Sequence, residues 1–313
     1  MDGFDVVVVG GGAAGLNGAL MLARSKRSVL VIDSGTPRNA PAAGVHGLLG
    51  REGMPPAELL RRGRAEVQSY GGQMISGSVE SAASNGTGFT VTLADGRTIG
   101  ARRLLVTTGL VDELPDIPGL RERWGRDVVH CPYCHGWEVR DRPIGIISSG
   151  PMSVHQTMLF RQLSDDVTFF THTRQAPSDD DAEKLAARGI SIVDGEVAGL
   201  DVDDDRLTGV RLTDGTVVPV GAVAVATRMV ARAGVLEKLG LCTVEHPSGV
   251  GEYIPTEAAG RTEVPGVWAA GNITDLTAQV GAAAAGGALA GAAINADLVE
   301  EEARRAITLH RAT

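Results

Sequence analysis

The start of the chain alternates between apolar runs and glycine-rich or polar breaks, a pattern typical of strands and helices packed in layers. Residues Phe4–Val9 end in the unbroken apolar run Val6–Val9, which predicts a buried strand. The turn Gly10–Gly15 follows, and then a helical stretch over Leu16–Ala23 and a second strand over Ser28–Ile32. This order predicts a βαβ unit.

The pattern next predicts one helix and several short strands. The expected bounds are Pro55–Tyr70 for the helix and Ser76–Val79, Phe89–Leu93 and Arg103–Thr107 for the strands. Asp95 and Gly96 between the last two strands are a hairpin signal. Prolines from Pro115 onward interrupt the pattern, so we expect a domain boundary near Val111.

The middle of the chain repeats the first pattern. Strands over Pro143–Ser148 and Val167–Thr171 flank a helix over Val154–Leu163, which predicts a second βαβ-like unit. Aspartate- and glycine-rich turns over residues 201–215 predict antiparallel hairpins. A final strand and an Ala/Gly-rich helix after residue 266 suit the completion of the first domain better than a third domain.

These elements predict an α/β fold with two Rossmann-like domains, each built of three layers in a ββα arrangement. A chain of 313 residues is long enough for two domains. We expect the first domain to be discontinuous and to comprise residues 1–111 and 244–313. Residues 112–243 are expected to form an inserted domain.

Composition narrows the classes of partner. The net charge of −9 argues against a nucleic-acid or anionic-membrane partner, because phosphate binding requires a basic face. Residues Met1–Asp5 lack the basic region of a signal peptide, and Val280–Ile294 is short and weakly apolar for a membrane span. We therefore expect a cytoplasmic protein.

The glycines of the first turn fit the pattern G-x-G-x-x-G. Gly10 makes the turn, Gly12 lets the backbone approach a pyrophosphate, and Gly15 allows close packing of helix on strand. Asp33 ends the second strand, where its carboxylate can accept hydrogen bonds from ribose hydroxyls. The motif predicts dinucleotide binding.

Two of the three cysteines form one C-x-x-C, Cys131 to Cys134. In a reducing compartment this pattern is typical of a redox or metal site. Pro132 suits an early helical position, where the helix N-terminus stabilises a thiolate. A zinc site that added His130 and His135 would crowd four ligands into six residues, so we favour redox chemistry.

Four other residues are expected to have structural roles. Cys242 is interpreted as a small core residue. The tryptophans Trp124, Trp137 and Trp268 are also expected in the core, although Trp137 is close to the redox pair in sequence.

Over nearly its whole length the sequence resembles the low-molecular-weight thioredoxin reductase family. The resemblance is carried by Gly10–Gly15, Thr107–Gly109, Cys131–Cys134 and Gly266–Asn272, with Gln279 beyond. It implies an FAD domain interrupted by a domain that carries the C-x-x-C, and a symmetric homodimer. It also implies that Cys134 lies against the flavin and that Cys131 is the outward, interchange thiol.

The resemblance further implies which residues contact FAD. Asn272 stands where the family has an acid, and His46 is expected to contact the flavin or the substrate. The full set is Gly10, Gly12, Ala13, Ala14, Gly15, Asp33, Ser34, Arg38, Asn39, His46, Val79, Thr108, Gly109, Gly271, Asn272, Gln279 and Val280.

The inserted domain departs from the family at its NADPH loop. Ser148–Ser153 keeps one glycine of the fingerprint, and Pro151 lacks an N–H that would bind phosphate. The cluster that grips the 2′-phosphate is reduced to Arg174, followed closely by three aspartates. We therefore expect little use of NADPH.

An eroded NADPH loop and a C-x-x-C followed by His135-Gly136 resemble the natural-product dithiol oxidases of the holomycin and gliotoxin type. This resemblance implies that a small dithiol is oxidised at Cys131–Cys134, with His135 as the base, and that FAD passes the electrons to O2 to give hydrogen peroxide. The alternatives are a disulfide reductase that uses NADPH or ferredoxin and a flavin-binding sensor without turnover. A glutaredoxin could also contain C-P-Y-C, but there the motif opens a small domain.

Overall fold

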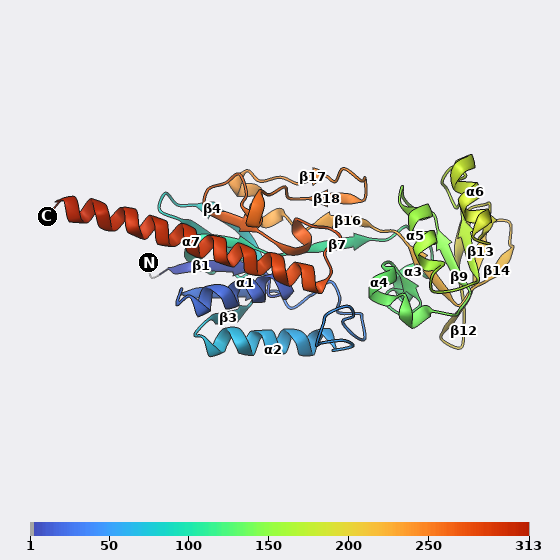
Figure 1. Cartoon of the computed structure of the whole chain (residues 1–313), viewed down its shortest axis with the longest axis horizontal. Coiled ribbons are helices and arrows are strands. Elements are labelled where there is room, and N and C mark those ends of the chain that lie inside the picture. Colours follow the sequence, from blue (N-terminus) through green and yellow to red (C-terminus); the bar gives the residue numbers. More distant parts are fainter. Residues whose placement is uncertain (1–2, 313) are drawn as a thin grey trace.

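The computed structural model describes residues 3–312, which form two α/β units joined by two crossing strands (Figure 1). We call residues 3–113 and 228–312 the first unit and residues 114–227 the inserted unit. Figure 1 shows the inserted unit at one end of an elongated molecule, beyond the strand β7.

The first unit is built on a seven-stranded sheet with the order β3-β2-β1-β6-β5-β4 and with β19 paired to β6. The central strands are parallel, and β4 and β5 form antiparallel pairs. The strands are β1 (Phe4–Val9), β2 (Val29–Asp33), β3 (Gln73–Ser76), β4 (Val79–Ser84), β5 (Phe89–Leu93), β6 (Thr98–Val106) and β19 (Val267–Ala269).

Helices cover one face of this sheet, and residues from 231 to 254 pack on the other. The helices are α1 (Ala13–Arg24), α2 (Pro56–Ser69) and α7 (Val280–Ala312), with short 3-10 turns η2 (Gly234–Leu239), η3 (Ala258–Gly260) and η4 (Gly271–Ile273). Along β1, Val6 and Val8 pack toward the helices, whereas Val7 and Val9 pack into the opposite core. This burial on both faces explains why the second part of the strand, Val6–Val9, is continuously apolar.

Helix α7 packs closely on α1. A Cβ added at Gly287 would lie 1.9 Å from the Ala14 carbonyl oxygen, so only glycine allows this approach. By length and composition α7 could cross a membrane, but such a helix also occurs in the core of soluble proteins. Its residues Ala290, Ile294 and Leu298 are buried in the core beside α1.

The inserted unit contains a parallel sheet with the order β11-β10-β9-β15-β8 and an antiparallel sheet β12-β13-β14. Its strands are β8 (Val128–Val129), β9 (Ile144–Ile147), β10 (Val167–Phe170), β11 (Ser191–Val193), β12 (Val197–Asp203), β13 (Arg206–Leu212), β14 (Val217–Pro219) and β15 (Ala222–Val225). Its helices are α3 (Leu120–Arg123), α4 (Pro132–His135), η1 (Trp137–Val139), α5 (Ser153–Phe160) and α6 (Asp179–Ala187). Helix α4, which carries the C-x-x-C, lies on the side that faces the first unit (Figure 1).

The chain crosses between the units on β7 (Leu110–Glu113) and β16 (Arg228–Ala231), which pair antiparallel. Strands β17 (Val244–Glu245) and β18 (Gly251–Tyr253) extend this small sheet. The chain therefore returns to the first unit at β16, earlier than the expected residue 244. Residues between the two positions, including Leu236 and Leu241, pack into the core of the first unit.

Three local expectations were wrong. Residues 77 and 78 connect β3 to β4, so Ser76–Val79 is not one strand. Cys242 is exposed, and Trp137 is 65% exposed. Trp137 instead stacks with the Arg140 guanidinium, which lies 4.1 Å from its ring centroid. Trp268 is buried as expected.

Candidate active site

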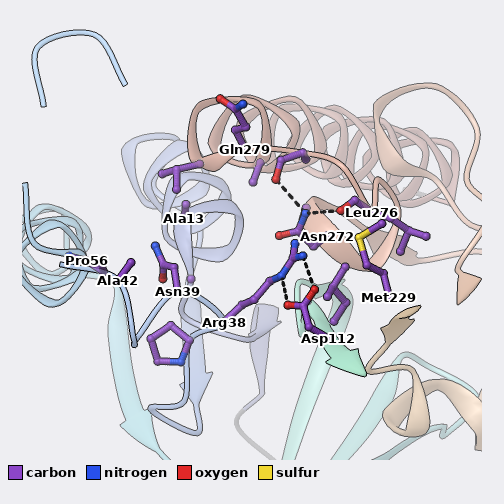
Figure 2. Close-up of a pocket in the computed structure, with 18 of the residues that line it drawn as sticks. Ala13, Arg38, Asn39, Ala42, Pro56, Asp112, Met229, Asn272, Leu276 and Gln279 are labelled. Atoms are coloured by element: carbon purple, nitrogen blue, oxygen red, sulfur yellow. Dashed lines mark hydrogen bonds and ion pairs between the residues drawn. The ribbon is translucent and has the colours of Figure 1, made fainter. Parts of the chain in front are cut away.

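A cavity of about 980 Å³ lies between the two units and is lined by both. Its volume is near the upper end of the range of ligand sites, about 300–1,000 Å³. All the predicted site residues except Gly15 line this cavity, including Cys131, Cys134 and His135. Figure 2 shows one part of its wall, where Ala13, Asn39 and Gln279 surround the space.

The glycine-rich turn suits a pyrophosphate. No side chain among residues 3–312 caps the N-terminus of α1 at Gly12, so its first amides remain available to an anion. A Cβ added at Gly12 would meet nothing within 4 Å, whereas one at Gly15 would lie 1.9 Å from the Gly10 carbonyl oxygen. Gly12 therefore borders the ligand space, and Gly15 allows the helix to pack on the strand. The Asp33 carboxylate accepts a hydrogen bond from the Gly11 N–H at 3.1 Å.

Asn272 organises the turn that leads into α7. Its Nδ2 group donates to the carbonyl oxygens of Asp275 (3.0 Å) and Ala278 (2.9 Å) and, more weakly, to that of Leu276 (3.4 Å; Figure 2). A carboxylate at this position could accept hydrogen bonds but could not donate them. The change from the family's acid to Asn272 is thus matched by the surrounding carbonyl groups.

A buried ion pair ties the first unit to the crossing strands. Arg38 donates two hydrogen bonds to Asp112, from Nε at 2.6 Å and from Nη2 at 2.7 Å (Figure 2). Asp112 lies on β7 and also accepts a hydrogen bond from the Thr227 hydroxyl, just before β16. Burial alone would raise the pKa of Asp112, but Arg38 and Thr227 outweigh burial and the pKa is lowered.

The two thiols of the C-x-x-C are in contact. Cys131 precedes α4, and Cys134 lies one helical turn later, with the sulfur atoms 2.7 Å apart. The hydrogen bond from Cys134, together with the backbone amides of Tyr133 and Cys134, lowers the pKa of Cys131 to about 7. The same hydrogen bond and burial raise the pKa of Cys134. Cys131 is therefore the first of the pair to ionise.

His135 lies beside charged groups from both units. Burial lowers its pKa, and the nearby Glu138 carboxylate opposes this effect. The His46 ring of the first unit approaches it edge-on, with ring centroids 6.5 Å apart. His46 Nε2 lies 3.5 Å from Glu138, and its Nδ1 lies 2.6 Å from Glu52. His46 thus lines the cavity, and its expected contact with the flavin or the substrate stays a prediction. Glu138 contacts this cavity residue, and the motifs did not indicate it.

His130 is more enclosed than His135. Its Nδ1 lies 3.2 Å from the Val225 carbonyl oxygen, and burial lowers its pKa. Gln156 of α5 donates to the His130 carbonyl oxygen at 2.6 Å. The Gln156 Oε1 atom is buried without a hydrogen-bond partner in the part of the chain that the structure describes. Both residues line the cavity, and no sequence motif marked Gln156.

The loop that would hold NADPH forms hydrogen bonds with itself. The Ser153 hydroxyl accepts hydrogen bonds from the N–H groups of Ser149 and Gly150, both at 3.2 Å, and donates to the Gly150 carbonyl oxygen at 2.8 Å. Arg174 donates to the Ser149 carbonyl oxygen at 2.6 Å. A smaller hollow of about 370 Å³ remains beside this loop. The amides and the cation that could bind phosphate are therefore already engaged.

Comparisons with known proteins agree with this arrangement. The family model "Pyridine nucleotide-disulphide oxidoreductase" matches residues 4–289. "Thioredoxin reductase tcpT" of Claviceps purpurea is 30% identical and "Thioredoxin reductase" of Listeria monocytogenes 27% identical. The first match covers 95% of both chains, and the second covers 97% of this chain and 96% of the relative.

Two solved structures share the fold at higher identity. The crystal structure of HlmI is 47% identical with a TM-score of 0.91, covering 98% of this chain and 96% of HlmI. An oxidoreductase from Agrobacterium tumefaciens is 34% identical with a TM-score of 0.89, covering 95% of this chain and 99% of that structure. The expected fold class is confirmed: it is thioredoxin-reductase-like, with two Rossmann-like sheets of the FAD and NADPH domains.

Proposed function

This chain belongs to the pyridine nucleotide-disulphide oxidoreductase family as a flavin disulfide oxidoreductase of the thioredoxin reductase type, and we propose that it works as a dithiol oxidase. The proposed reaction converts a small dithiol and O2 into a cyclic disulfide and hydrogen peroxide. The observation that carries the proposal is the state of the NADPH loop. The Ser153 hydroxyl accepts hydrogen bonds from two N–H groups that could bind phosphate, and Arg174 is hydrogen-bonded to the Ser149 carbonyl oxygen.

An enzyme that cannot readily bind NADPH must take its electrons from elsewhere. A pyrophosphate needs several free N–H donors, and a 2′-phosphate needs bidentate cations. Here the N–H groups of Ser149 and Gly150 are satisfied internally, and Pro151 supplies no N–H. The C-x-x-C lines the same cavity as the glycine-rich turn. This combination supports electron flow from a thiol substrate toward the flavin.

FAD fits the residues of the larger cavity. The α1 N-terminus with Gly12 suits its pyrophosphate, Asp33 suits its ribose, and Asn272 with the start of α7 suits its flavin side. When bound, FAD supplies the two-electron step from the dithiol to O2. Arg38 adds a positive charge at this wall, close enough to favour ionisation of both thiols.

The exchange steps take Cys131 as the outward thiol and Cys134 as the thiol against the flavin, as the family resemblance implies. With Cys131–Cys134 oxidised, His135 accepts the proton of a substrate thiol, and the resulting thiolate attacks the Cys131 sulfur. A substrate–Cys131 bond forms, the Cys131–Cys134 bond breaks, and Cys134 leaves as a thiolate. After His135 has released the first proton to solvent, it accepts the proton of the second substrate thiol. This thiolate attacks the substrate sulfur that is bound to Cys131, the substrate–Cys131 bond breaks, and Cys131 leaves as a thiolate. This leaving group is favourable because its pKa is lowered to about 7.

The substrate class is proposed from the shape of the site and from the relatives. The resolving thiol must reach the same sulfur that the first thiol attacked, which favours two thiols on one small molecule. HlmI, of the holomycin type, supports the same class. The proposal also includes a symmetric homodimer in the cytoplasm.

Two measurements on the purified protein test the proposal. With a small dithiol in air we expect uptake of one O2 per disulfide formed and release of hydrogen peroxide. Without oxygen, the dithiol should bleach the flavin rapidly and NADPH should bleach it negligibly. Rapid bleaching by micromolar NADPH, with no oxygen uptake on dithiol, would instead assign the protein to the disulfide reductases.

A further inference from the structure

We propose that Glu138 is a positioning residue for the thiol chemistry: its carboxylate, three residues after His135 and 3.5 Å from the His46 ring that contacts His135, stabilises the protonated form of His135. The proposal rests on the function proposed above, because it concerns the base of that reaction. It goes further by assigning a role to a carboxylate and to an imidazole from the opposite unit.

The local fold brings Glu138 and His135 to one face. Helix α4 ends at His135, and the 3-10 turn η1 begins at Trp137, so the chain continues to coil through Glu138. Residues three apart on such a turn are neighbours. The Glu138 charge accordingly acts on His135 and favours its protonated form.

The first unit holds the other side of this carboxylate. His46 directs Nε2 to Glu138 at 3.5 Å and Nδ1 to Glu52 at 2.6 Å, which fixes the plane of its ring. Its ring also approaches that of His135 edge-on, with the centroids 6.5 Å apart. Glu138 is therefore shared by two imidazoles that belong to different units.

The chemistry needs this carboxylate because the base is partly buried. When His135 accepts the thiol proton, an S–H bond breaks, an N–H bond forms and a positive charge appears on the ring. Burial opposes that charge, and the nearby Glu138 carboxylate compensates for it. His46 acts in the opposite direction and disfavours protonation of His135.

Other ionisable groups also lie around His135. Cys131 and Cys134 lie on its own helix, and His155 of α5 lines the same cavity. Glu52 reaches His135 only through His46, and Arg38 acts on the thiols. Glu138 and His46 are the two neighbours with opposite expected effects on His135, which makes the proposal testable by the sign of a shift.

The experiment is an NMR titration of the histidine side chains in the oxidised holoprotein, with His135 identified by the resonance lost in His135→Gln. Glu138→Gln should lower the pKa of His135, and His46→Asn should raise it, each by roughly one unit. Glu138→Asp should restore most of the wild-type value. Glu122→Gln, a change to an exposed carboxylate on α3, is the matched control and should have no effect.

Kinetics provide the second readout. In anaerobic reduction of the flavin by a dithiol, the acidic limb of the rate should move to lower pH in Glu138→Gln and to higher pH in His46→Asn. Flavin content and circular dichroism verify that each variant is folded. A His135 pKa that is unchanged, or that moves in the same direction in both variants, overturns the inference. Because the titration needs no turnover, that result is separate from a wild-type protein that fails to consume O2, which would overturn only the proposed function.

Discussion

Arg38 and Asp112 join the loop after β2 to the strand on which the chain leaves the first unit, through two hydrogen bonds of 2.6 and 2.7 Å. Thr227 binds the same carboxylate from the end of the inserted unit, just before the returning strand. One carboxylate therefore connects both crossing strands to the body that forms the glycine-rich turn. Arg38, Asp112 and the C-x-x-C all line the larger cavity.

Arg38→Gln should destabilise the protein by about 1–3 kcal/mol, because it leaves a buried carboxylate without its cation. Asp112→Asn should destabilise the protein less, since the Arg38 side chain is 28% exposed and can reach water. Urea unfolding with the FAD content held constant measures both. The double variant should be less destabilised than the sum of the single variants. Strict additivity would show that the pair contributes no coupling.

Both thiols should be essential for turnover and neither for FAD binding. Cys131→Ser and Cys134→Ser each prevent formation of the protein disulfide, so steady-state oxidation of the dithiol should fall at least to about 10⁻³ of wild type. In Cys131→Ser, the remaining Cys134 thiolate should give a long-wavelength charge-transfer absorbance with the flavin. If only Cys134→Ser shows that band, the inner and outer thiols are reversed.

The reduced protein should react with iodoacetamide at Cys131 with a midpoint near pH 7, because its pKa is lowered to about 7 by the hydrogen bond from Cys134. The lowered pKa stabilises the reduced fold fully above the unfolded pKa near 9. This contribution is lost as the pH falls through 7. In Cys134→Ala the donor is removed, and the midpoint should move up toward 9. A midpoint that does not change would mean that the helix amides dominate.

Asn272→Asp should weaken FAD binding by roughly tenfold or more. The new carboxylate cannot donate to the carbonyl oxygens of Asp275 and Ala278 and would be repelled by them. Asn272→Ala removes the donors without adding a charge, so it should be milder. Fluorescence titration of the apoprotein with FAD measures both. Equal losses would mean that repulsion plays no part.

Local sequence patterns predicted the strands well because the apolar and polar positions within each strand reflect which of its faces are buried. Val6–Val9 at the end of the first strand is apolar throughout since both faces are covered there, and Phe89–Leu93 has buried residues at alternate positions since one face is more open. Both strands have the predicted bounds. The return to the first unit was predicted too late because nothing local in residues 228–243 tells which of two cores their apolar side chains join.

The motifs predicted the residues around the cavity but not the contacts between units. Glu138 is visible in the sequence three residues after His135, yet its neighbour His46 lies far away in the chain. Asp112 and Thr227 are polar residues in strand-like segments, and only the pairing of β7 with β16 brings them together. Such pairs depend on tertiary structure, which a single sequence does not show.

The hydrogen bonds of Ser153 bear on how such a protein could change its electron donor during evolution. A mutation that only added a second arginine near Arg174 would not restore a nucleotide site, because the amides of Ser149 and Gly150 would still be bound to the serine hydroxyl. At least two changes would be needed, one to release the loop and one to supply charge, and the first would give no benefit by itself. Ser153 and Arg174 therefore form two separate obstacles to nucleotide binding, one through the loop amides and one through charge, and removing either alone leaves the other in place.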